Sequence, residues 1–294
     1  MTQAFILGAG LGTRLRPLTD HLPKPLVPLH HRPLAAWTVE ACERAGIRRF
    51  AVNTHHLPEA WEGFGAGMDL TLFHEPVLLE TGGGLKNIQS WLRDEPLLVH
   101  NGDIFSTLPL HKLILAHQAS GLPVTLAVRS FGEARHIALN HIEDRVTDIR
   151  AMLGKAEGTH VFSGIYCVNP VFLEMLPEGE KISVIPAFLE LAKEGKLGAI
   201  VLDEGEWLDL GERDSYLAAH RKLAPAGAVH ESAVVTGARI ERSVVGAGAV
   251  IGKGAEVIDS VIWPGAQILP GAKLEKCIVC SGQPVSGTRL NKDL

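Results

Sequence analysis

The spacing of apolar and polar residues changes character once along the chain, near residue 224. Before that point, short apolar runs alternate with segments whose apolar residues recur at helical spacing, which predicts strands and helices in turn. Strands are expected at residues 4–7, 50–53, 70–73, 97–100, 124–129, 137–141, 161–168 and 199–202, and helices at 34–45, 83–92, 110–118, 184–193 and 213–223. This alternation predicts an α/β fold, with a mostly parallel sheet covered by helices on both faces.

A repeat of seventeen residues replaces this pattern after residue 224. The segments TGARIERSVV, KGAEVIDSVI and PGAKLEKCIV begin at residues 236, 253 and 270. Small residues at the turns and β-branched residues between them predict short strands stacked in a coil, with three sides of about six residues of which one is shortened. The alternative is a strand-rich tail with accidental periodicity, and the three matching copies favour the coil.

Composition narrows the class of protein. With 294 residues, of which 46% are hydrophobic and 21% charged, the chain can bury a sizeable core as one large domain or two smaller ones. A net charge of -5 argues against nucleic-acid binding. No run is apolar enough for a membrane span or a signal peptide, so we expect no membrane partner and a cytoplasmic location.

The four cysteines agree with a reducing compartment, because they are few and unevenly spread. They are Cys42, Cys167, Cys277 and Cys280. The last two have the spacing of half a zinc knuckle, but no second pair accompanies them. Burial as small apolar residues is therefore the favoured interpretation of this pair.

A glycine-rich loop follows the first predicted strand and reads GAGLGTRLRP from residue 8. Thr13 stands where a dinucleotide-binding fingerprint needs its third glycine, and the loop lacks the Gly-Lys-Ser/Thr ending of a Walker A motif. Glycines here are compatible with a tight turn or with a nest of backbone N–H groups that binds an anion. The glycines alone leave both interpretations open.

Two cations in the same stretch favour phosphate binding. Arg14 follows the glycines at once and can donate two parallel hydrogen bonds to phosphate oxygens. Lys24 lies between Pro23 and Pro25, which predicts an extended conformation at Lys24 and a stiff stem for its ammonium group. A stiff stem lowers the entropy cost of binding a phosphate.

The stretch from residue 8 to 29 resembles the N-terminal motif of the sugar-1-phosphate nucleotidyltransferases, also called NDP-sugar pyrophosphorylases. The motifs ETGGGLKN, HNGDIF, FSGIY and EWLDLG, which begin at residues 80, 100, 162 and 206, follow in family order. The coils resemble the left-handed β-helix that many members append. The resemblance covers essentially the whole chain. It implies a Rossmann-like nucleotidyltransferase domain at residues 1–224 and a left-handed β-helix with a C-terminal tail at residues 225–294.

The resemblance also implies roles for individual residues. In the family the glycine loop wraps the nucleoside triphosphate, and the ETGGG motif contacts the base and ribose. The nucleotide-binding residues implied here are Gly8, Ala9, Gly10, Gly12, Thr13, Thr81, Gly82 and Gly83. Arg14 matches the arginine that holds the departing phosphates. Lys24 matches the lysine that bridges the reactant phosphates.

Two aspartates complete the implied catalytic set. Asp103 follows a predicted strand at its carboxyl end, where α/β sheets bind their ligands, and Asp209 lies about a hundred residues further on. Taken alone, each would more often be a turn or cap residue. Two carboxylates from distant strand ends are the hard ligands that Mg²⁺ prefers, and the resemblance implies that they bind this cofactor.

The implied reaction joins a sugar 1-phosphate to UTP or GTP and releases pyrophosphate. A sugar-phosphate oxygen attacks the α-phosphorus in line, so no protein nucleophile is needed. Catalysis then consists of positioning and charge neutralisation.

The chain departs from the family at the sugar site. Many members carry Glu-Lys-Pro before the FSG-like motif, whereas the corresponding stretch here reads TDIRAMLGKAEG. Arg150 or Lys155 could supply the missing cation. Gly164 is expected beneath the sugar, and Asn140 is a second candidate for sugar contact or else a solvated strand end. ETGGG without Glu-Lys-Pro resembles the N-acetylmuramate-1-phosphate uridylyltransferases, whereas the β-helix resembles mannose-1-phosphate guanylyltransferase-like proteins, so base and sugar stay open.

Rival functions can be weighed against the same residues. A catalytically silent, nucleotide-sugar-binding regulatory subunit would not need Arg14, Lys24, Asp103 and Asp209 together. A dinucleotide-dependent oxidoreductase is disfavoured by Thr13. The β-helix could be a second enzyme, but it has few coils and a single histidine, His230, so we expect it to serve packing or homo-oligomerisation.

Overall fold

The chain forms two compact units whose segments interleave along the sequence. The computed structural model describes all residues from 1 to 294. The first unit, here called the α/β unit, contains Met1–Gly10 and Trp37–Trp207, and the second, the β-helix unit, contains Leu11–Ala36 and Leu208–Leu294. The division predicted at residue 224 follows the change in sequence pattern, and it stays a prediction. No helix is long and apolar enough to cross a bilayer.

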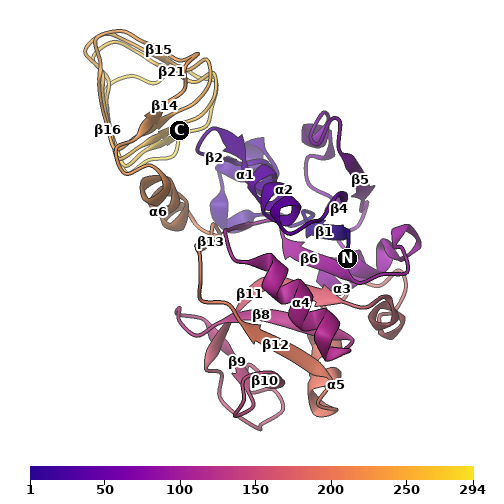
Figure 1. The fold of residues 1–294 in the computed structure, drawn as a ribbon. Coiled ribbons are helices and arrows are strands. Elements are labelled where there is room, and N and C mark those ends of the chain that lie inside the picture. Colours follow the sequence, from indigo (N-terminus) through magenta and orange to yellow (C-terminus); the bar gives the residue numbers. More distant parts are fainter. The chain divides into compact units, whose positions relative to one another are not determined.

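A nine-stranded sheet forms the centre of the α/β unit (Figure 1). Its strands are β1 (Gln3–Leu7), β4 (Arg49–Thr54), β5 (Asp69–His74), β6 (Leu97–Asn101), β8 (Val124–Arg129), β9 (Arg135–Leu139), β10 (Val146–Ile149), β11 (His160–Val168) and β12 (Leu197–Val201). Parallel pairing joins β6, β1, β4 and β5, and also joins β12 to β8. β11 runs antiparallel to β6, β8 and β9, so the sheet is mixed.

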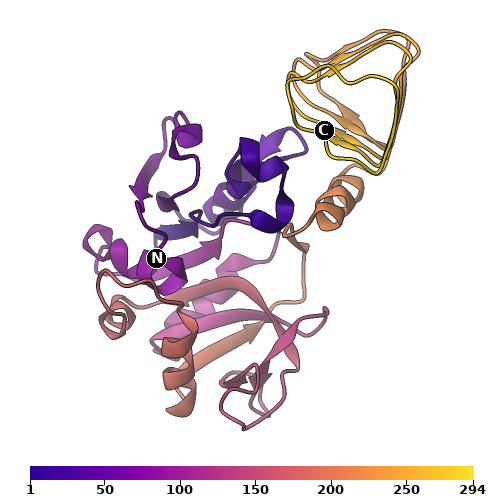
Figure 2. The same cartoon turned by 180° about the vertical axis from the view of Figure 1, so that it is seen from behind.

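Helices cover both faces of this sheet (Figure 2). They are α2 (Leu34–Arg44), α3 (Glu80–Asn87), α4 (Leu110–Ser120) and α5 (Ile185–Lys193). Leu85 of α3 and Phe188 of α5 enter the core that contains Phe5 and Tyr166. α4 lies on the opposite face, where His117 Nδ1 is 3.0 Å from Thr125 Oγ1. The predicted layered α/β architecture is confirmed.

The predicted elements agree best where apolar runs are long. β8 and α6 (Arg213–Leu223) have the predicted bounds, whereas the helix predicted at 83–92 begins at Glu80 and stops at Asn87. The strands β7 (Ile104–Ser106), β10 and β13 (Trp207–Asp209) were not predicted, because three or four residues are too few to show a hydrophobic period. Short 3-10 helices, η3 (Pro58–Trp61), η4 (Gln89–Trp91) and η5 (Pro170–Met175), lie in the connections between the longer elements.

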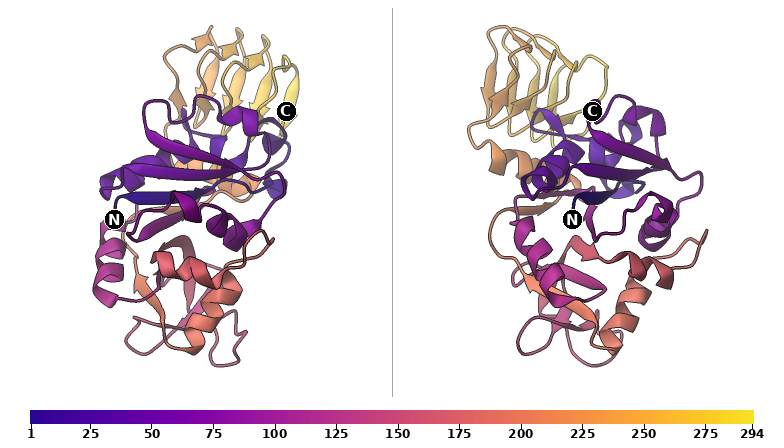
Figure 3. Two further views of the ribbon diagram at one scale, coloured as in Figure 1. Left: turned by 90° about the vertical axis from the view of Figure 1, so that its right-hand side faces the viewer. Right: turned by 45° about the vertical axis from the view of Figure 1, so that its right-hand side comes forward.

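The C-terminal coils form three parallel sheets, which Figure 1 shows end-on as a triangle and Figure 3 shows from the side as stacked strands. One face contains β14 (Ala228–Val229), β17 (Val244–Val245), β20 (Val261–Ile262) and β23 (Ile278–Val279). The second contains β15 (Val234–Val235), β18 (Val250–Ile251) and β21 (Gln267–Ile268). The third contains β16 (Arg239–Glu241), β19 (Glu256–Ile258), β22 (Lys273–Glu275) and β24 (Thr288–Leu290). This arrangement is consistent with the predicted left-handed β-helix, extended by a fourth strand on two faces.

The seventeen-residue repeat is visible in the strand register, where Val244 pairs with Val261 and Val261 with Ile278. Inside the coil, the Ser260 N–H group donates to Ser243 Oγ at 3.0 Å and the Cys277 N–H group donates to Ser260 Oγ at 2.9 Å. These buried side chains replace the backbone acceptors that a tight corner lacks. All four cysteines are buried and free. Cys277 therefore belongs to the coil interior, as the favoured interpretation predicted.

The N-terminal segment 11–36 packs within the β-helix unit. It contains η1 (Thr13–Leu15), α1 (Leu18–His21), η2 (Lys24–Leu26), β2 (Pro28–Leu29) and β3 (Arg32–Pro33). Its apolar side chains join α6 and one face of the coil in a buried group, here called the junction cluster. The members are Leu15, Leu18, Val27, Tyr216, Leu217, Val261, Trp263, Ile278 and Cys280. The segment with the predicted phosphate-binding cations thus shares a core with the β-helix.

Candidate functional site

The glycine loop leaves β1 through a buried relay of polar side chains. The Gly8 N–H group donates to Asn53 Oδ1 at 2.7 Å, and Asn53 Nδ2 donates to Glu75 Oε1 at 2.7 Å. Glu75 Oε2 accepts the Leu79 N–H group at 2.9 Å, at the start of α3. Asn53 and Glu75 are almost fully buried. This relay fixes the base of the loop to α3, and it already uses the Gly8 N–H group that a phosphate was expected to meet.

The glycines of ETGGG lie in the first turns of α3, packed against residues 180–184. The N–H groups of Gly82 and Gly83 both donate to Ile182 O, at 2.8 and 3.1 Å, and Thr81 Oγ1 accepts the Val184 N–H group at 2.9 Å. A Cβ added at Gly83 would lie only 2.3 Å from Glu180 O, so this helix can approach only without a side chain there. The protein's own packing thus requires this glycine. The predicted contacts with the base stay a prediction.

Asp103 lies in the turn between β6 and β7, next to the end of β1. The Gly102 N–H group donates to Leu7 O at 2.9 Å, which joins this turn to the strand that leads into the glycine loop. Gly164 packs from β11 onto the same region and has a positive φ of 73°. A Cβ there would lie 2.7 Å from Asn101 Nδ2, and the positive φ is a conformation that favours glycine. Gly164 therefore packs against side chains on either side of Asp103, in the same unit.

His100 is a buried neighbour of this turn that the sequence did not single out. Its Nδ1 lies 2.7 Å from Asn101 O. Burial lowers the pKa of His100 to about 4, although the Asn101 bond and the charge of Asp103 act in the opposite direction. At neutral pH this imidazole is uncharged, so it supplies no cation beside Asp103.

Arg14 and Asp209 both lie beside Gly211 in the β-helix unit, just before α6. Arg14 Nη1 lies 3.1 Å from Glu212 Oε1, and both side chains are about two-thirds exposed, at 65% each. A Cβ added at Gly211 would lie 3.0 Å from Asp209 Oδ1 and 3.1 Å from Arg14 Nη2. The two predicted catalytic residues thus flank the same glycine. An exposed ion pair such as Arg14–Glu212 contributes little stability, so Arg14 can exchange partners cheaply.

Lys24 is held more firmly than Arg14, but not in the predicted manner. Only 7% of Lys24 is exposed, and it begins η2 instead of being extended. The Leu26 N–H group donates to Pro23 O at 2.8 Å and the Val27 N–H group donates to Lys24 O at 3.2 Å. These turn bonds outweigh the steric preference of a residue before proline, so the extended conformation predicted for Lys24 is wrong.

Gly12 and Thr13 lie beside Lys24 in the β-helix unit. Gly12 has a positive φ of 61°, and a Cβ added there would lie 3.2 Å from Lys24 Cβ. Thr13 follows as the first residue of η1. The last part of the glycine loop therefore belongs with the two cations, whereas its first part belongs with β1.

The candidates for the missing sugar-site cation lie on a loop wrapped around a buried carboxylate. Asp148 accepts the N–H groups of Ile149, Leu153 and Lys155 at 2.7, 3.0 and 2.9 Å. Burial acts to raise the pKa of Asp148, but these backbone bonds together outweigh it and lower the pKa. Arg150, which has a positive φ of 55°, is exposed on this loop. Sequence reasoning missed Asp148, since a lone Asp in a strand gives no sign of its distant acceptors.

Asn140 forms the hairpin between β9 and β10. Its Oδ1 accepts the N–H groups of Asp144 and Arg145 at 3.0 and 3.1 Å, and its Nδ2 donates to Asp144 Oδ1 at 2.8 Å. Its side chain thus has a complete structural role in a turn. Contact with a sugar stays a prediction for Asn140.

The predicted site residues divide between the two units. The α/β unit contains Gly8, Ala9, Gly10, Thr81, Gly82, Gly83, Asp103, Asn140, Arg150 and Gly164, and the β-helix unit contains Gly12, Thr13, Arg14, Lys24 and Asp209. Both predicted catalytic cations are thus carried by the β-helix unit, together with one of the two carboxylates.

Comparison with known proteins agrees with this set of motifs. Residues 3–225 match the nucleotidyl transferase family, and residues 218–288 match the GlmU-like C-terminal hexapeptide family. The chain belongs to the nucleotidyl transferase family. The predicted class, a sugar-1-phosphate nucleotidyltransferase with a C-terminal β-helix, is confirmed, and the oxidoreductase alternative is excluded.

Similar proteins cover nearly the whole chain. A probable mannose-1-phosphate guanylyltransferase of Oryza sativa is 31% identical, over 96% of this chain and 82% of its own. A mannose-1-phosphate guanylyltransferase of Mycobacterium tuberculosis is 32% identical, over 93% and 83%. The solved structure of a UDP-glucose pyrophosphorylase complexed with UDP-glucose shares 17% identity with a TM-score of 0.67, and covers 76% of this chain and 99% of its own. This last likeness shows the fold.

Proposed function

We propose that this protein transfers a nucleotidyl group from GTP to a hexose 1-phosphate, giving a GDP-sugar and pyrophosphate. The observation that supports GTP is the similarity, at about 30% identity over more than nine-tenths of the chain, to proteins named mannose-1-phosphate guanylyltransferase. Mannose 1-phosphate is accordingly the first sugar to test.

UTP is the second candidate. It is favoured by the ETGGG motif and by the absence of Glu-Lys-Pro from residues 147–158. This combination resembles the uridylyltransferases of N-acetylmuramate 1-phosphate. The two candidates differ only in the base and sugar, so one set of substrates separates them.

In the proposed reaction, an oxygen of the sugar phosphate forms a bond to the α-phosphorus while the bond from the α-phosphorus to the bridging oxygen breaks. The electron pair leaves with pyrophosphate. Arg14 is proposed to bind the β- and γ-phosphates, and its exposed, exchangeable ion pair with Glu212 supports this role. Lys24 is proposed to stabilise charge at the reacting centre. Its low exposure supports this role, because a buried ammonium interacts more strongly than a solvated one.

Asp103 and Asp209 are proposed to hold Mg²⁺. Their hard carboxylate oxygens fit Mg²⁺, which commonly takes one or two carboxylates and completes its shell with phosphates and water. When bound, the ion would neutralise phosphate charge and orient the triphosphate.

The test is a matrix of four NTPs against several sugar 1-phosphates, with pyrophosphate release as the readout. We expect GTP or UTP with a hexose 1-phosphate to give the highest kcat/KM. A clear preference for CTP would contradict the choice of base. Nucleotide-sugar binding without pyrophosphate release from any pair would instead support a silent regulatory subunit.

The β-helix is proposed to permit homo-oligomerisation, since hexapeptide coils expose flat faces and open ends. Light scattering coupled to size-exclusion chromatography would test this. A monomer at micromolar concentration would contradict it.

A further inference from the structure

The β-helix shares its core with the segment that carries Arg14 and Lys24. Leu15, which directly follows Arg14, and Val27, which lies three residues after Lys24, both belong to the junction cluster, as does Leu18. Their partners in the junction cluster include Val261 and Trp263 from the outer face of the coil. Burial of this apolar surface is the main force that would order a segment with so little regular structure.

A chain of hydrogen bonds links the coil to the backbone next to Lys24. Trp263 Nε1–H, just after β20, donates to Tyr216 Oη at 3.1 Å. Tyr216 O–H donates to Pro28 O at 2.5 Å, and His220 Nε2 lies 3.2 Å from the same oxygen. Pro28 is four residues after Lys24. All three side chains, Trp263, Tyr216 and His220, are almost fully buried. Their hydrogen bonds are therefore stronger than the same bonds would be at the surface.

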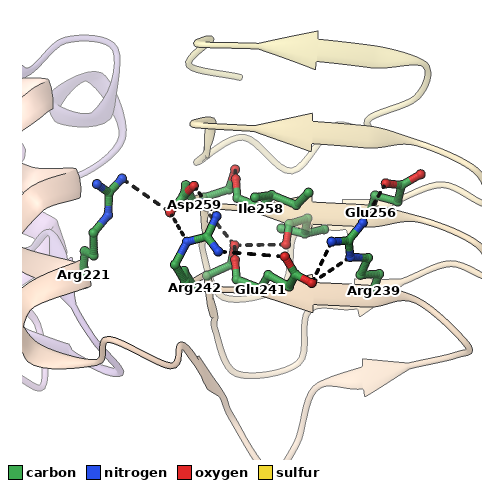
Figure 4. A network of polar contacts seen from close by, with 10 residues as sticks. Arg221, Arg239, Glu241, Arg242, Glu256, Ile258 and Asp259 are labelled. Carbon is green, nitrogen blue, oxygen red and sulfur yellow. Dashed lines mark hydrogen bonds and ion pairs between the residues drawn. The ribbon is translucent and has the colours of Figure 1, made fainter.

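Hydrogen bonds and ion pairs of charged side chains connect α6 to the corners of the coil. Arg213 donates to Asp293 Oδ1 and Asn291 Oδ1, both at 2.7 Å. Arg221 Nη2 lies 3.4 Å from Asp259 Oδ1. Arg242 also donates to that carboxylate, as Figure 4 shows. Because α6 begins four residues after Asp209, these contacts limit where the chain around Asp209 and Glu212 can lie.

We propose that the β-helix is the scaffold that positions segment 11–36 for turnover, with Trp263 and Tyr216 as positioning residues. The coil thereby sets the place of Lys24 and Arg14 without touching a substrate. The kinetic consequence rests on the proposed function, whereas the ordering of the segment does not. This role differs from a second active site in the coil and from a module that serves only oligomerisation.

Hydrogen exchange in the ligand-free full-length protein tests the ordering. Tyr216→Phe keeps the ring but leaves Trp263 Nε1 without its acceptor and Pro28 O without one donor. We expect backbone amides of residues 11–36 to exchange about threefold to tenfold faster, as loss of one buried hydrogen bond implies. Ile268→Val is the matched control, because Ile268 is buried in the coil core away from the junction cluster. Unchanged exchange in residues 11–36 of Tyr216→Phe would overturn the proposal.

Steady-state kinetics tests the consequence for catalysis. In Tyr216→Phe and Trp263→Phe, we expect KM for the NTP to rise about threefold to tenfold while the fraction of folded protein stays near that of the wild type. KM for the NTP in the double variant should be little higher than in Tyr216→Phe alone, because both substitutions interrupt the same chain of hydrogen bonds. Ile268→Val should leave KM unchanged. Equal KM values in Tyr216→Phe and Ile268→Val would overturn the positioning role, and an inactive wild type would refute the proposed function while leaving the exchange result valid.

Discussion

The two units hold their polar site residues in different ways. In the α/β unit, buried polar side chains such as Asn53, Glu75 and Asp148 fix loops through hydrogen bonds to backbone N–H groups. In the β-helix unit, the segment with Arg14 and Lys24 is held by apolar packing and by contacts with α6. The segment with Arg14 and Lys24 thus depends on the coil for its apolar core, as the proposed scaffold role requires.

The largest expected effect comes from removing one proposed catalytic group from each unit. Lys24→Ala in the β-helix unit and Asp103→Asn in the α/β unit should each lower kcat by about a hundredfold or more. The first removes the cation proposed to stabilise the reacting phosphates, and the second removes a carboxylate proposed to hold Mg²⁺. Pyrophosphate release measures the loss, and circular dichroism checks folding. Wild-type turnover in either folded variant would remove that residue from the mechanism.

A smaller effect is expected from breaking the polar relay of the α/β unit. Glu75→Ala leaves the Leu79 N–H group and Asn53 Nδ2 without their acceptors, which should cost about 1–3 kcal/mol of unfolding free energy. Denaturant unfolding measures this change, and the exposed Glu62→Ala is the control. A variant as stable as Glu62→Ala would show that the relay does not hold the loop.

Both units should lose stability in mild acid through a buried histidine. Burial lowers the pKa of His100 to about 4, and burial with the nearby His30 and His31 lowers that of His220 to about 3. At pH values between these lowered pKa values and about 6.5, each histidine is protonated in the unfolded chain but neutral in the folded protein. The free energy of unfolding therefore falls as the pH drops below about 6.5.

At pH 5 each buried histidine should lower the free energy of unfolding by on the order of 1–2 kcal/mol relative to its value at neutral pH. Thermal unfolding between pH 7 and 5 measures the slope. His220→Phe should flatten it, whereas replacement of the exposed His111 should not. A slope unchanged in His220→Phe would show that this imidazole titrates normally in the folded protein.

The smallest effect is expected at the surface of the β-helix unit. Arg221 is half exposed, so Arg221→Ala should change the unfolding free energy by no more than about 0.5 kcal/mol. Its effect on KM for the NTP should be smaller than that of Tyr216→Phe. A larger effect on KM for Arg221→Ala would mean that surface ion pairs, and not the buried hydrogen bonds to Pro28 O, hold α6 and the N-terminal segment in place.

The local spacing of apolar residues was enough to predict much of the fold. The bounds of β8 and α6, and the register of Val244 with Val261, follow from apolar spacing and from the repeat. The conformation of Lys24 was predicted wrongly, since turn hydrogen bonds outweighed the preference set by Pro25. Each of these features depends on residues that are near one another in the sequence.

Long-range contacts could not be predicted in the same way. Tyr216 and Pro28 are 188 residues apart, and nothing in either neighbourhood indicates the other. Asn53 and Glu75 likewise look like ordinary polar residues beside strands until their partners are known. The family motifs identified Arg14 and Asp209, and the structure added that both flank Gly211.

The central claim is best tested by following the α-phosphate of the nucleotide. The full-length protein is incubated with Mg²⁺, α-labelled GTP or UTP and a hexose 1-phosphate, and labelled products and pyrophosphate are counted. We predict that labelled NDP-sugar forms in an amount equal to the pyrophosphate released. Label that appears only in a nucleoside monophosphate, or stays in the triphosphate with every sugar, would contradict it.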